Sequence, residues 1–329
     1  MDIKPILFIC SKTDLTADLV LLELKKEGIS VIRINTEDFP TKLAFSIHQK
    51  TVKNTWIVDL LNSTLKKRFI LNQIRSVYCR PYKEPRPSRL IKNPIERSLI
   101  IEQSQLLIEW LEDLLPCFWL NSPQAVMKSR SKVLQLTLAN QLGFLTPDSL
   151  ITNNPEDAFK FYSKHKGNIV AKLLQATPST RKLKGFIFTT KINSTDLKLF
   201  YQIKYSPVLL QQYIEKQYEI RATVVGNQVF AVKIDSQCLE TTKDDWRCYK
   251  FGSPPPHTPF ELPLNIQSKL FKMNEKLGLK FGAYDLIYSP KGEYVFLEVN
   301  GNGQWGWIQE LTKIPISKAI ARLLINGGK

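Results

Sequence analysis

The sequence predicts an α/β domain at the amino terminus, followed by two α+β domains that are rich in antiparallel hairpins. Three observations lead to this fold class: a strand–helix–strand pattern over residues 5–35, alternating apolar runs on either side of Gly226-Asn227, and a final hairpin that ends in "VFLEVN". The chain has 329 residues, of which 43% are hydrophobic and 23% charged. This is globular composition with room for two or three domains.

The first domain is predicted from a βαβ unit and a long helix. "ILFIC" and "VIRIN" are typical of buried strands, and "DLTADLVLLELKKEG" between them is an amphipathic helix that begins at Asp14 or Thr16 and ends at Gly28. No glycine-rich loop follows the first strand, so a dinucleotide site of the GxGxxG kind is not supported. After several short strands, a long helix is expected between Pro94 and Pro116.

The remainder of the chain predicts helices alternating with hairpins. Ser122-Pro123 opens a helix that we expect to run as far as Gly143. "NIVAKLL", "GFIFTT" and "VLLQQYI" are predicted strands, Gly226-Asn227 is a two-residue hairpin turn, and "ISKAIARLLI" is a closing helix. These elements divide the chain into three expected domains, residues 1–121, 122–207 and 208–329.

Composition and charge narrow the classes of function. No run of about 18 apolar residues suggests a membrane span, and no signal-peptide pattern opens the chain, so we expect a cytoplasmic protein. The five cysteines form no CxxC pair and the three histidines are scattered, which argues against a zinc site or a His-based triad. The net charge is +16, of which +9 falls within residues 126–214. Such an excess suits an acidic peptide, a nucleotide or a nucleic acid, or it only keeps the surface solvated.

The last hairpin carries the clearest chemical signal. If its loop is Pro290–Glu293, the register places Asp285 opposite Glu298, and Asn300 shares the face of Glu298 because side chains alternate along a strand. Three oxygen-bearing groups then meet on a sheet with apolar neighbours, and hard oxygen ligands of this kind suit Mg²⁺ that holds substrate phosphates. The alternative is an exposed face with a cross-strand acid pair, which like-charge repulsion disfavours.

Four cationic residues on other elements would complete a phosphate site. Lys172 lies within the apolar strand "NIVAKLL", where an unpaired lysine is rare. Arg221 alternates with apolar residues in "EIRATVV", Arg247 lies in "DDWR", and Lys132 lies on the helix after Ser122. Each alone could be a surface side chain whose stem covers apolar area.

The ordered motifs resemble the ATP-grasp superfamily of carboxylate–amine ligases. Within it the chain is most similar to the microviridin-type peptide macrocyclases, or graspetide synthetases, and less similar to the ribosomal-protein glutamate ligases. The resemblance covers nearly the whole chain and rests on "SVYCRPYKEP", "LNSPQAVMKSRSKVLQLTLANQLGFLTPDSL", "IVAKLL", "LLQQYIEKQYEIR", "DDWR", "GAYDLI" and "FLEVN" in this order. It implies an ATP-grasp fold with an amino-terminal pre-ATP-grasp domain, and a nucleotide held between two α+β subdomains.

The resemblance also implies roles for the candidate residues. Asp285, Glu298 and Asn300 would hold the magnesium ions, expected to be two, that bridge the phosphates of ATP. Arg247 would contact the phosphates, and Arg221 the phosphates or an acyl-phosphate.

The rest of the nucleotide would meet the other subdomain. Lys132 and Lys172 would contact ATP, and Glu219 would accept hydrogen bonds from the ribose hydroxyls. The hinge, whose backbone would meet the adenine edge, consists of Gln212, Tyr213 and Ile214.

The implied reaction is activation of a substrate carboxylate by ATP as an acyl-phosphate, followed by attack of an amine or a hydroxyl. The implied partner is an acidic ribosomal precursor peptide, cyclised through ω-ester or ω-amide links and docked by its leader on the central domain, and a homodimer is expected. Two alternatives stay open: a linear peptide or amino-acid ligase, and a non-catalytic nucleotide-binding module. Nucleic acid is disfavoured because basic and aromatic residues do not interleave in a recognisable RNA-binding motif.

The chain also departs from the superfamily pattern. Residues 175–184, "QATPSTRKLK", stand where many ATP-grasp enzymes have a glycine-rich phosphate loop. Asp235 takes the place of an arginine of the glutamate ligases, which weakens that reading. After Asn300, Trp305 and Trp307 either help to close the site around the acyl-phosphate or belong to the core.

Overall fold

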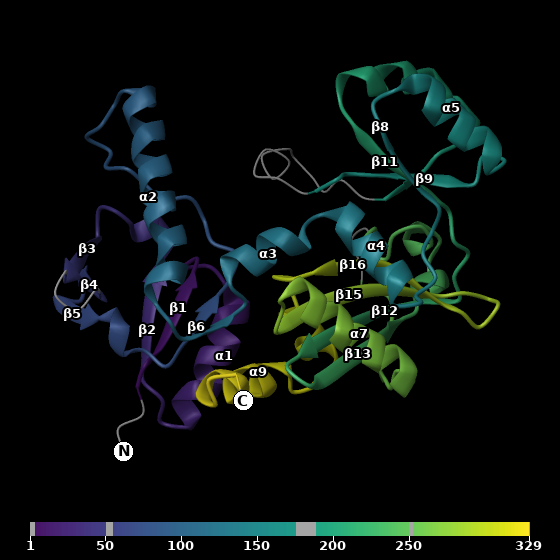
Figure 1. The fold of residues 1–329 in the computed structure, drawn as a ribbon. Helices are drawn as coiled ribbons and strands as arrows, with labels where there is room; N and C mark the ends of the chain where they lie inside the picture. The colour runs from purple at the N-terminus through teal and green to yellow at the C-terminus, as the bar shows by residue number, and fades with distance from the viewer. Residues whose placement is uncertain (1–3, 51–54, 176–188, 250–252, 329) are drawn as a thin grey trace.

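The protein is built on four β-sheets within the residues that the structure, a computed structural model, describes: 4–50, 55–175, 189–249 and 253–328. The strand orders are β2-β1-β6-β7, β3-β4-β5, β10-β9-β11-β8 and β14-β13-β12-β15-β16. In Figure 1 the first two sheets lie at the left, the third lies at the upper right, and the five-stranded sheet lies below the third. The α/β and α+β fold class predicted from the sequence is confirmed.

The amino-terminal sheet is parallel, as the βαβ pattern predicts. Asp14 caps α1 by accepting a hydrogen bond from the Ala17 N–H at 3.0 Å, and Gly28 ends it with a left-handed φ of 70°. A 21-residue helix, α2, projects away from this part of the molecule (Figure 1). The elements are β1 (Ile6–Cys10), α1 (Leu15–Lys26), β2 (Val31–Asn35), β3 (Leu43–Lys50), β4 (Thr55–Asn62), β5 (Lys67–Ile70), β6 (Ser76–Cys79), α2 (Pro94–Leu114) and β7 (Phe118–Leu120).

The predicted single helix after Ser122 is wrong in one respect, because it is two helices, α3 (Pro123–Ser129) and α4 (Lys132–Gln141). Ser122 caps the first, and Ser131 caps the second by accepting from the Leu134 N–H at 3.2 Å. The serine side chains compete with the helical backbone and favour a new start at this point.

The middle sheet is antiparallel and is covered by α5 on one face. Of the predicted strand "GFIFTT", residues 185–188 lie outside the described residues, and Thr190 belongs to β10. The predicted domain limits stay predictions, although β11, which starts at Val208, pairs within this sheet. The elements are β8 (Ser149–Thr152), α5 (Pro155–Lys164), β9 (Ile169–Lys172), β10 (Thr190–Lys191) and β11 (Val208–Gln212).

The carboxyl-terminal sheet is also antiparallel, and Gly226 has the positive φ, 58°, that its predicted hairpin turn requires. Helices α4 and α7 pack on one face of this sheet, and α8 and α9 on the other. The elements are β12 (Tyr218–Val225), β13 (Gln228–Ile234), β14 (His257–Phe260), α7 (Leu264–Leu277), β15 (Phe281–Tyr288), β16 (Tyr294–Asn300), α8 (Gly306–Thr312) and α9 (Ile316–Ile325). Short 3₁₀ helices are η1 (Thr36–Asp38), η3 (Leu71–Gln73), η4 (Ser194–Tyr205), η5 (Ser236–Cys238) and η6 (Glu240–Thr242).

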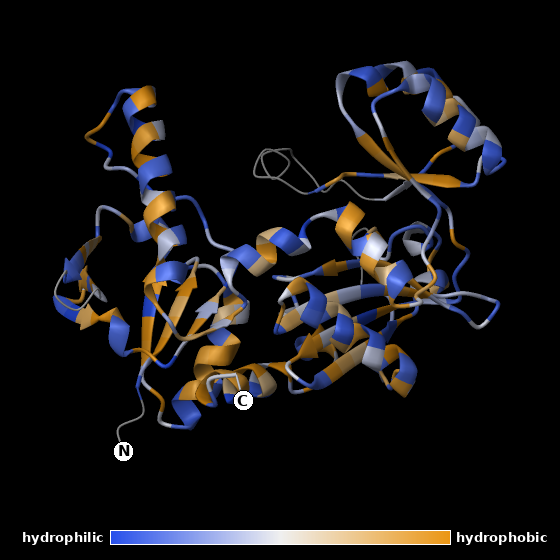
Figure 2. Ribbon diagram, in the orientation of Figure 1, coloured by the Kyte–Doolittle hydropathy of each residue, from blue (hydrophilic) through white to orange (hydrophobic). Residues whose placement is uncertain are grey.

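One apolar core joins the first and the last sheet. It contains Ile6 and Phe8 of β1, Val225 of β12, Ile320 of α9 and Trp305, which directly precedes α8, all nearly inaccessible to solvent. Helices α1 and α9 lie side by side between the two sheets (Figure 1), and apolar residues line their contact (Figure 2). The amino-terminal domain is therefore fixed to the strands that carry the candidate site. Among the described residues, no helix is long and apolar enough to cross a membrane.

Candidate functional site

A cleft of roughly 1660 Å³ opens between the middle and the carboxyl-terminal sheets and continues to the amino-terminal domain. All the site residues predicted from the sequence line it: Lys132, Lys172, Gln212, Tyr213, Ile214, Glu219, Arg221, Arg247, Asp285, Glu298 and Asn300. Pockets for small molecules commonly measure about 300–1,000 Å³. The cleft therefore has room for a nucleotide together with part of a second substrate.

The last hairpin places Asp285 directly opposite Glu298, as the sequence predicts, but by a different register at its turn. Tyr294 pairs with Tyr288 and not with Ser289, and a bulge next to Leu286 restores the predicted pairing. Two consecutive residues, Leu297 and Glu298, consequently line the cleft, while the preceding Phe296 lies in the core.

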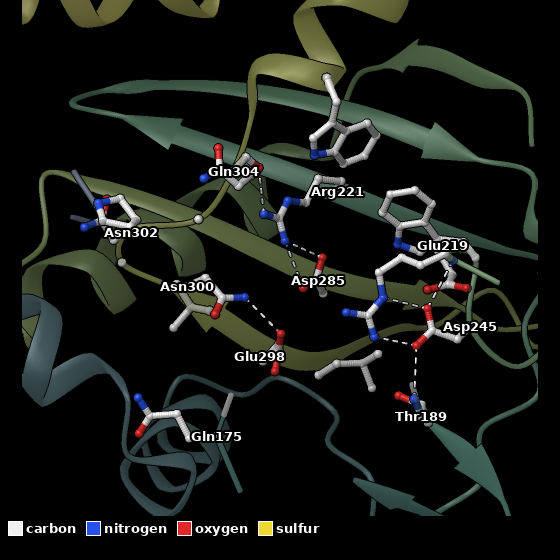
Figure 3. A pocket seen from close by; sticks show the side chains of 18 of the residues that line it. Gln175, Thr189, Glu219, Arg221, Asp245, Asp285, Glu298, Asn300, Asn302 and Gln304 are labelled. Carbon is white, nitrogen blue, oxygen red and sulfur yellow. Dashed lines mark hydrogen bonds and ion pairs between the residues drawn. The ribbon is translucent and has the colours of Figure 1, made fainter. Parts of the chain in front are cut away.

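Asp285 is held by Arg221 of the neighbouring strand. The Nη1 atom of Arg221 donates to both carboxylate oxygens of Asp285, at 2.7 and 2.9 Å, and its Nη2 atom donates to the Gln304 carbonyl at 3.0 Å (Figure 3). Burial raises the pKa of Asp285, Arg221 opposes this rise, and the nearby Glu298 adds to it. The Asp285 carboxylate is thus costly to hold here without a cation.

Glu298 has two partners. Lys132 of α4 forms an ion pair with its Oε2 atom, and the Asn300 Nδ2 atom donates to its Oε1 atom at 2.9 Å. Burial acts to raise the pKa of Glu298, but the charge and hydrogen bond of Lys132 outweigh it and hold the pKa well below its usual range. Helix α4 is in turn fixed to β16 by Gln135, whose side chain exchanges two hydrogen bonds with the Val299 backbone at 2.9 and 3.0 Å.

These three residues fit a magnesium site. Because the Asn300 Nδ2 atom donates to Glu298, its Oδ1 atom is the end left to bind a cation. No group of three His, Cys, Asp or Glu side chains suited to a metal occurs in the described ranges. Mg²⁺ needs no such group, since it keeps several waters and is usually bound by one or two carboxylates together with substrate phosphates.

Lys172, at the end of β9, faces the cleft from the opposite sheet. Burial lowers the pKa of its ammonium group, and the charges of Lys132 and Lys216 lower it further against the opposing effect of Glu298. No hydrogen bond or ion pair joins the ammonium group of this lysine to any other described residue. A phosphate would supply the missing negative charge.

The predicted hinge follows β11 and crosses from one sheet to the other. The backbone N–H of Gln212 donates to the Asp148 carbonyl and that of Tyr213 to the Asn168 carbonyl, both at 2.9 Å. The Lys191 ammonium lies 4.1 Å from the centre of the Tyr213 ring, and burial raises the pKa of that tyrosine to about 12. With two of its N–H groups engaged, the hinge would offer a nucleotide base its carbonyls and the backbone from Ile214 onward.

Glu219 is paired with a residue that sequence reasoning missed. The Lys216 Nζ atom donates to the Glu219 carboxylate at 2.8 Å and to the Asp244 carbonyl at 2.9 Å, and its side chain is only 4% exposed. Burial raises the pKa of Glu219, while Lys216 acts to lower it. The three-residue spacing of Lys216 and Glu219 was the available signal, but the intervening chain is not helical and gave no reason to pair them.

Arg247 also has a partner that was missed. Its Nε atom donates to the Asp245 Oδ1 atom at 2.8 Å and its Nη2 atom to Oδ2 at 2.5 Å. The same Oδ2 atom also accepts from the Thr189 N–H at 3.1 Å. Burial acts to raise the pKa of Asp245, but the hydrogen bonds from Arg247 outweigh it and lower that pKa. Asp245 thereby ties the "DDWR" segment to the chain that leads into β10, across the cleft (Figure 3).

The two tryptophans after the metal strand differ from each other. Trp305 is 0% exposed and belongs to the core. Trp307 is half-buried, lines the cleft and packs on Trp246 with a ring-centre distance of 4.7 Å. The loop 175–184 is described only at Gln175, which lines the cleft, and its other residues lie outside the described part of the chain.

Comparisons with known proteins agree with this geometry. Residues 5–127 match the family model described as the MvdD pre-ATP grasp domain. The macrocyclase MdnB from Microcystis aeruginosa MRC is 30% identical with a TM-score of 0.80, covering 98% of this chain and 100% of that one. A RiPP-associated ATP-grasp ligase of Chryseobacterium gregarium, solved with ADP and a leader and core peptide, is 29% identical with a TM-score of 0.87, covering 98% and 97%.

Two further comparisons are more distant. The ATP-grasp ligase PsnB, solved with a precursor variant, Mg and ADP, shares the fold at 20% identity and a TM-score of 0.77, over 99% of each chain. A probable alpha-L-glutamate ligase of Coxiella burnetii is 25% identical over 226 residues, which are 66% of this chain and 70% of that protein. The match to MdnB extends over 98% of this chain and all of MdnB. The chain therefore belongs to the microviridin-type macrocyclase family of ATP-grasp ligases.

Proposed function

We propose that this protein activates Asp or Glu side chains of a ribosomal precursor peptide with ATP and links them to hydroxyl or amine side chains of the same peptide. The observation that carries this proposal is the meeting of Asp285, Glu298 and Asn300 with four cationic side chains in one cleft. The nearly full-length similarity to the Chryseobacterium gregarium ligase, which was solved with a leader and core peptide, supports the peptide as the substrate.

The reaction has two steps whose atoms balance. An oxygen of the substrate carboxylate attacks the γ-phosphorus of ATP, ADP leaves, and an acyl-phosphate forms. The hydroxyl or amine of the acceptor side chain then attacks the acyl carbon, inorganic phosphate leaves, and the acceptor gives up a proton. Each link therefore removes the elements of one water from the peptide, and an ω-ester or ω-amide results.

The protein contributes position and charge. Lys132, Lys172 and Arg247 neutralise negative charge on the nucleotide phosphates, and Arg221 neutralises charge on the acyl-phosphate. When bound, Mg²⁺ supplies further charge neutralisation between phosphate oxygens. We propose two ions, because the Asp285 and Glu298 carboxylates and the Asn300 amide together offer more oxygens than one ion needs beside phosphate and water.

The base and ribose of the nucleotide would lie at the other end of the cleft. The Gln212–Ile214 hinge would meet the base and Glu219 the ribose hydroxyls. Glu219 is suited to this role because its pairing with Lys216 engages one carboxylate oxygen, Oε1, and leaves Oε2 to accept.

An acidic peptide fits the charge of the chain. The net charge is +16, and +9 of it lies within residues 126–214, which contain the middle sheet. This segment is the part on which we expect the leader to dock. The reaction would take place in the cytoplasm, where ribosomal peptides and ATP occur together.

Mass spectrometry tests the proposal directly. The purified protein is incubated with ATP, Mg²⁺ and a peptide from a neighbouring reading frame that ends in a core rich in Thr, Asp and Glu. We expect the peptide to lose the mass of one water for each link, and ADP to be released. ADP release without a change in the mass of the peptide would contradict macrocyclisation. So would a rate of ADP release that does not depend on the peptide.

The similarity to the Coxiella protein keeps a second candidate in view, a linear ligase. In the same experiment with glutamate added, a linear ligase would add the mass of one residue to the peptide. A non-catalytic module would bind nucleotide and release no ADP.

We further propose that the protein is a homodimer that uses the outer face of α2. This helix has only three buried residues, and Ile95, Leu99 and Trp110 are 80%, 54% and 56% exposed. Light scattering is expected to give twice the chain mass, and Leu99→Glu to give the monomer mass. A monomer in the wild-type protein would exclude this proposal.

A further inference from the structure

A buried arginine of the amino-terminal domain reaches into the loop that follows the metal strand. Arg80, directly after β6, is 2% exposed. Its Nε atom donates to the Asp14 carboxylate at 3.1 Å. Its other two nitrogens donate to the Asn302 Oδ1 atom at 3.4 Å, the Gly303 carbonyl at 3.3 Å and the Gln304 Oε1 atom at 3.0 Å. Three of the four hydrogen bonds that the guanidinium donates thus go to this loop.

These contacts determine which way two side-chain amides point. A guanidinium can only donate hydrogen bonds, so the amide oxygens of Asn302 and Gln304 must face Arg80. The Thr16 hydroxyl donates to the same Gln304 oxygen at 2.9 Å. The NH₂ groups of both amides are consequently turned away from Arg80, and neither has a hydrogen-bond acceptor among the residues that the structure describes.

Both amides line the cleft beside Arg221. In Figure 3 they lie on the opposite side of Asp285 from Glu219 and Asp245. The Gln304 carbonyl accepts from the Arg221 Nη2 atom, so the same loop also fixes Arg221.

The loop can approach this closely because residue 303 is a glycine. A Cβ atom there would lie 2.6 Å from the Ala283 side chain and 2.9 Å from the Arg221 guanidinium. Three donors, two neutral amides and one guanidinium, are therefore held next to one another at the end of the cleft that is remote from the hinge.

We propose that Asn302 and Gln304 form, with Arg221, the subsite for the carboxylate of the peptide that is to be activated, and that Arg80 is the residue that positions it. This inference rests on the proposed function. A carboxylate has about four acceptor sites and no donor, so a set of groups with only N–H ends toward it is complementary. The nucleotide phosphates have their own cations nearer the hinge, Lys132 and Lys172, which leaves this subsite to the second substrate.

Amide-to-acid substitutions test the subsite while keeping shape. Asn302→Asp and Gln304→Glu replace each inward donor by an acceptor, and each is expected to raise the KM for the precursor peptide at least about tenfold. The KM for ATP is expected to stay within about twofold and the melting temperature unchanged. Asn326→Asp, an exposed amide at the end of α9, adds the same charge and serves as the matched control.

Arg80→Lys tests the positioning role. The lysine keeps a charge beside Asp14 but cannot hold two amides, so the KM for the peptide is expected to rise while the KM for ATP does not. Arg33→Lys is the control, since Arg33 is another arginine of the same sheet that pairs with Asp18 and makes no contact with the 302–304 loop. Combining Arg80→Lys with Gln304→Ala is expected to give less than the product of the two single effects.

The outcomes separate the two proposals. If the wild-type protein neither releases ADP nor alters the peptide, the proposed function fails. If the wild-type protein forms links and the Asn302 and Gln304 variants keep its KM for the peptide, the subsite is wrong. A lower melting temperature of Arg80→Lys with an unchanged peptide KM, or fully multiplicative effects in the double variant, would make Arg80 a structural residue only.

Discussion

The two walls of the cleft treat charge differently. On the wall formed by the carboxyl-terminal sheet, charged side chains face each other in pairs: Arg221 with Asp285, and Lys216 with Glu219. On the wall formed by the middle sheet, the half-buried Lys172 is desolvated, and its ammonium group has no hydrogen-bond or ion-pair partner within the described part of the chain. One wall is thus electrostatically complete without a ligand, and the other is not.

The charge that a ligand would contribute therefore differs between the two walls. A phosphate next to Lys172 supplies a charge that the protein lacks, so binding there relieves a desolvated cation. At the other wall the carboxylates that would hold Mg²⁺ already have cationic partners, Arg221 at Asp285 and Lys132 at Glu298. Substitutions on one wall should therefore have effects different from substitutions on the other.

The largest effect is expected from Glu298→Gln. The variant keeps its shape but loses a charge that holds magnesium, so ADP release is expected to fall at least about a hundredfold. The measurement is ADP release with saturating peptide at several Mg²⁺ concentrations. Glu293→Gln, in the exposed turn of the same hairpin, is the control and should be unaffected. Unimpaired turnover of the Glu298 variant would remove the magnesium assignment.

Lys172→Met removes the unpaired ammonium group of the opposite wall. Its effects on the KM for ATP and on the melting temperature should be opposite in benefit, with weaker ATP binding and higher stability. The KM for ATP is expected to rise about ten- to hundredfold, since the phosphates lose a buried cation. The melting temperature without nucleotide is expected to rise by about 1–3 °C, because an unpaired desolvated charge is removed. Lys198→Met, at an exposed position in η4, should change neither quantity. A less stable variant with unchanged KM would show that this lysine serves the fold.

Glu219→Gln alters a pair at the hinge end of the cleft. The amide has one oxygen where the carboxylate has two, and it carries no charge. The ribose and Lys216 therefore lose one acceptor between them, and a rise of about three- to tenfold in the KM for ATP is expected, with kcat nearly unchanged. Glu261→Gln, exposed and without a partner among the described residues, is the control. A fall in kcat with constant KM would place Glu219 in the chemical step.

The smallest effect concerns the surface outside both walls. Binding of a fluorescent precursor peptide is expected to weaken about three- to tenfold between low salt and ~0.5 M salt, because exposed charges are screened. A peptide with Asn and Gln in place of Asp and Glu should bind weakly at every salt concentration. Salt-independent binding of the acidic peptide would mean that the +16 charge does not recruit it.

The sequence predicted the parts of this molecule that local chemistry determines. Asp14 as a helix cap, Gly226 in a hairpin turn and the Asp285–Glu298 pairing all follow from short-range patterns, and the structure confirms each. The prediction of one continuous helix through Arg130 was wrong. A serine inside an apolar repeat does not by itself indicate that one helix ends and another begins.

The partners of the predicted residues could not be found in the same way. Lys216 lies near Glu219 in the sequence but pairs with it only because the linker folds back toward Asp244. Arg80 is 222 residues away from Asn302, and no pattern in either segment predicts a contact with the other. Contacts of this kind depend on how the domains pack, which single-sequence patterns do not contain.

The bulge in the last hairpin has a consequence for how such enzymes can change over time. In a regular strand, loss of one residue turns every following side chain to the other face. Here Leu297 is the extra residue, so its deletion would leave Glu298 opposite Asp285 and still facing the cleft. The apolar side chain that lines the cleft at Leu297 and the carboxylate beside it are therefore separable traits. Evolution or a protein engineer could remove or exchange the first without losing the second.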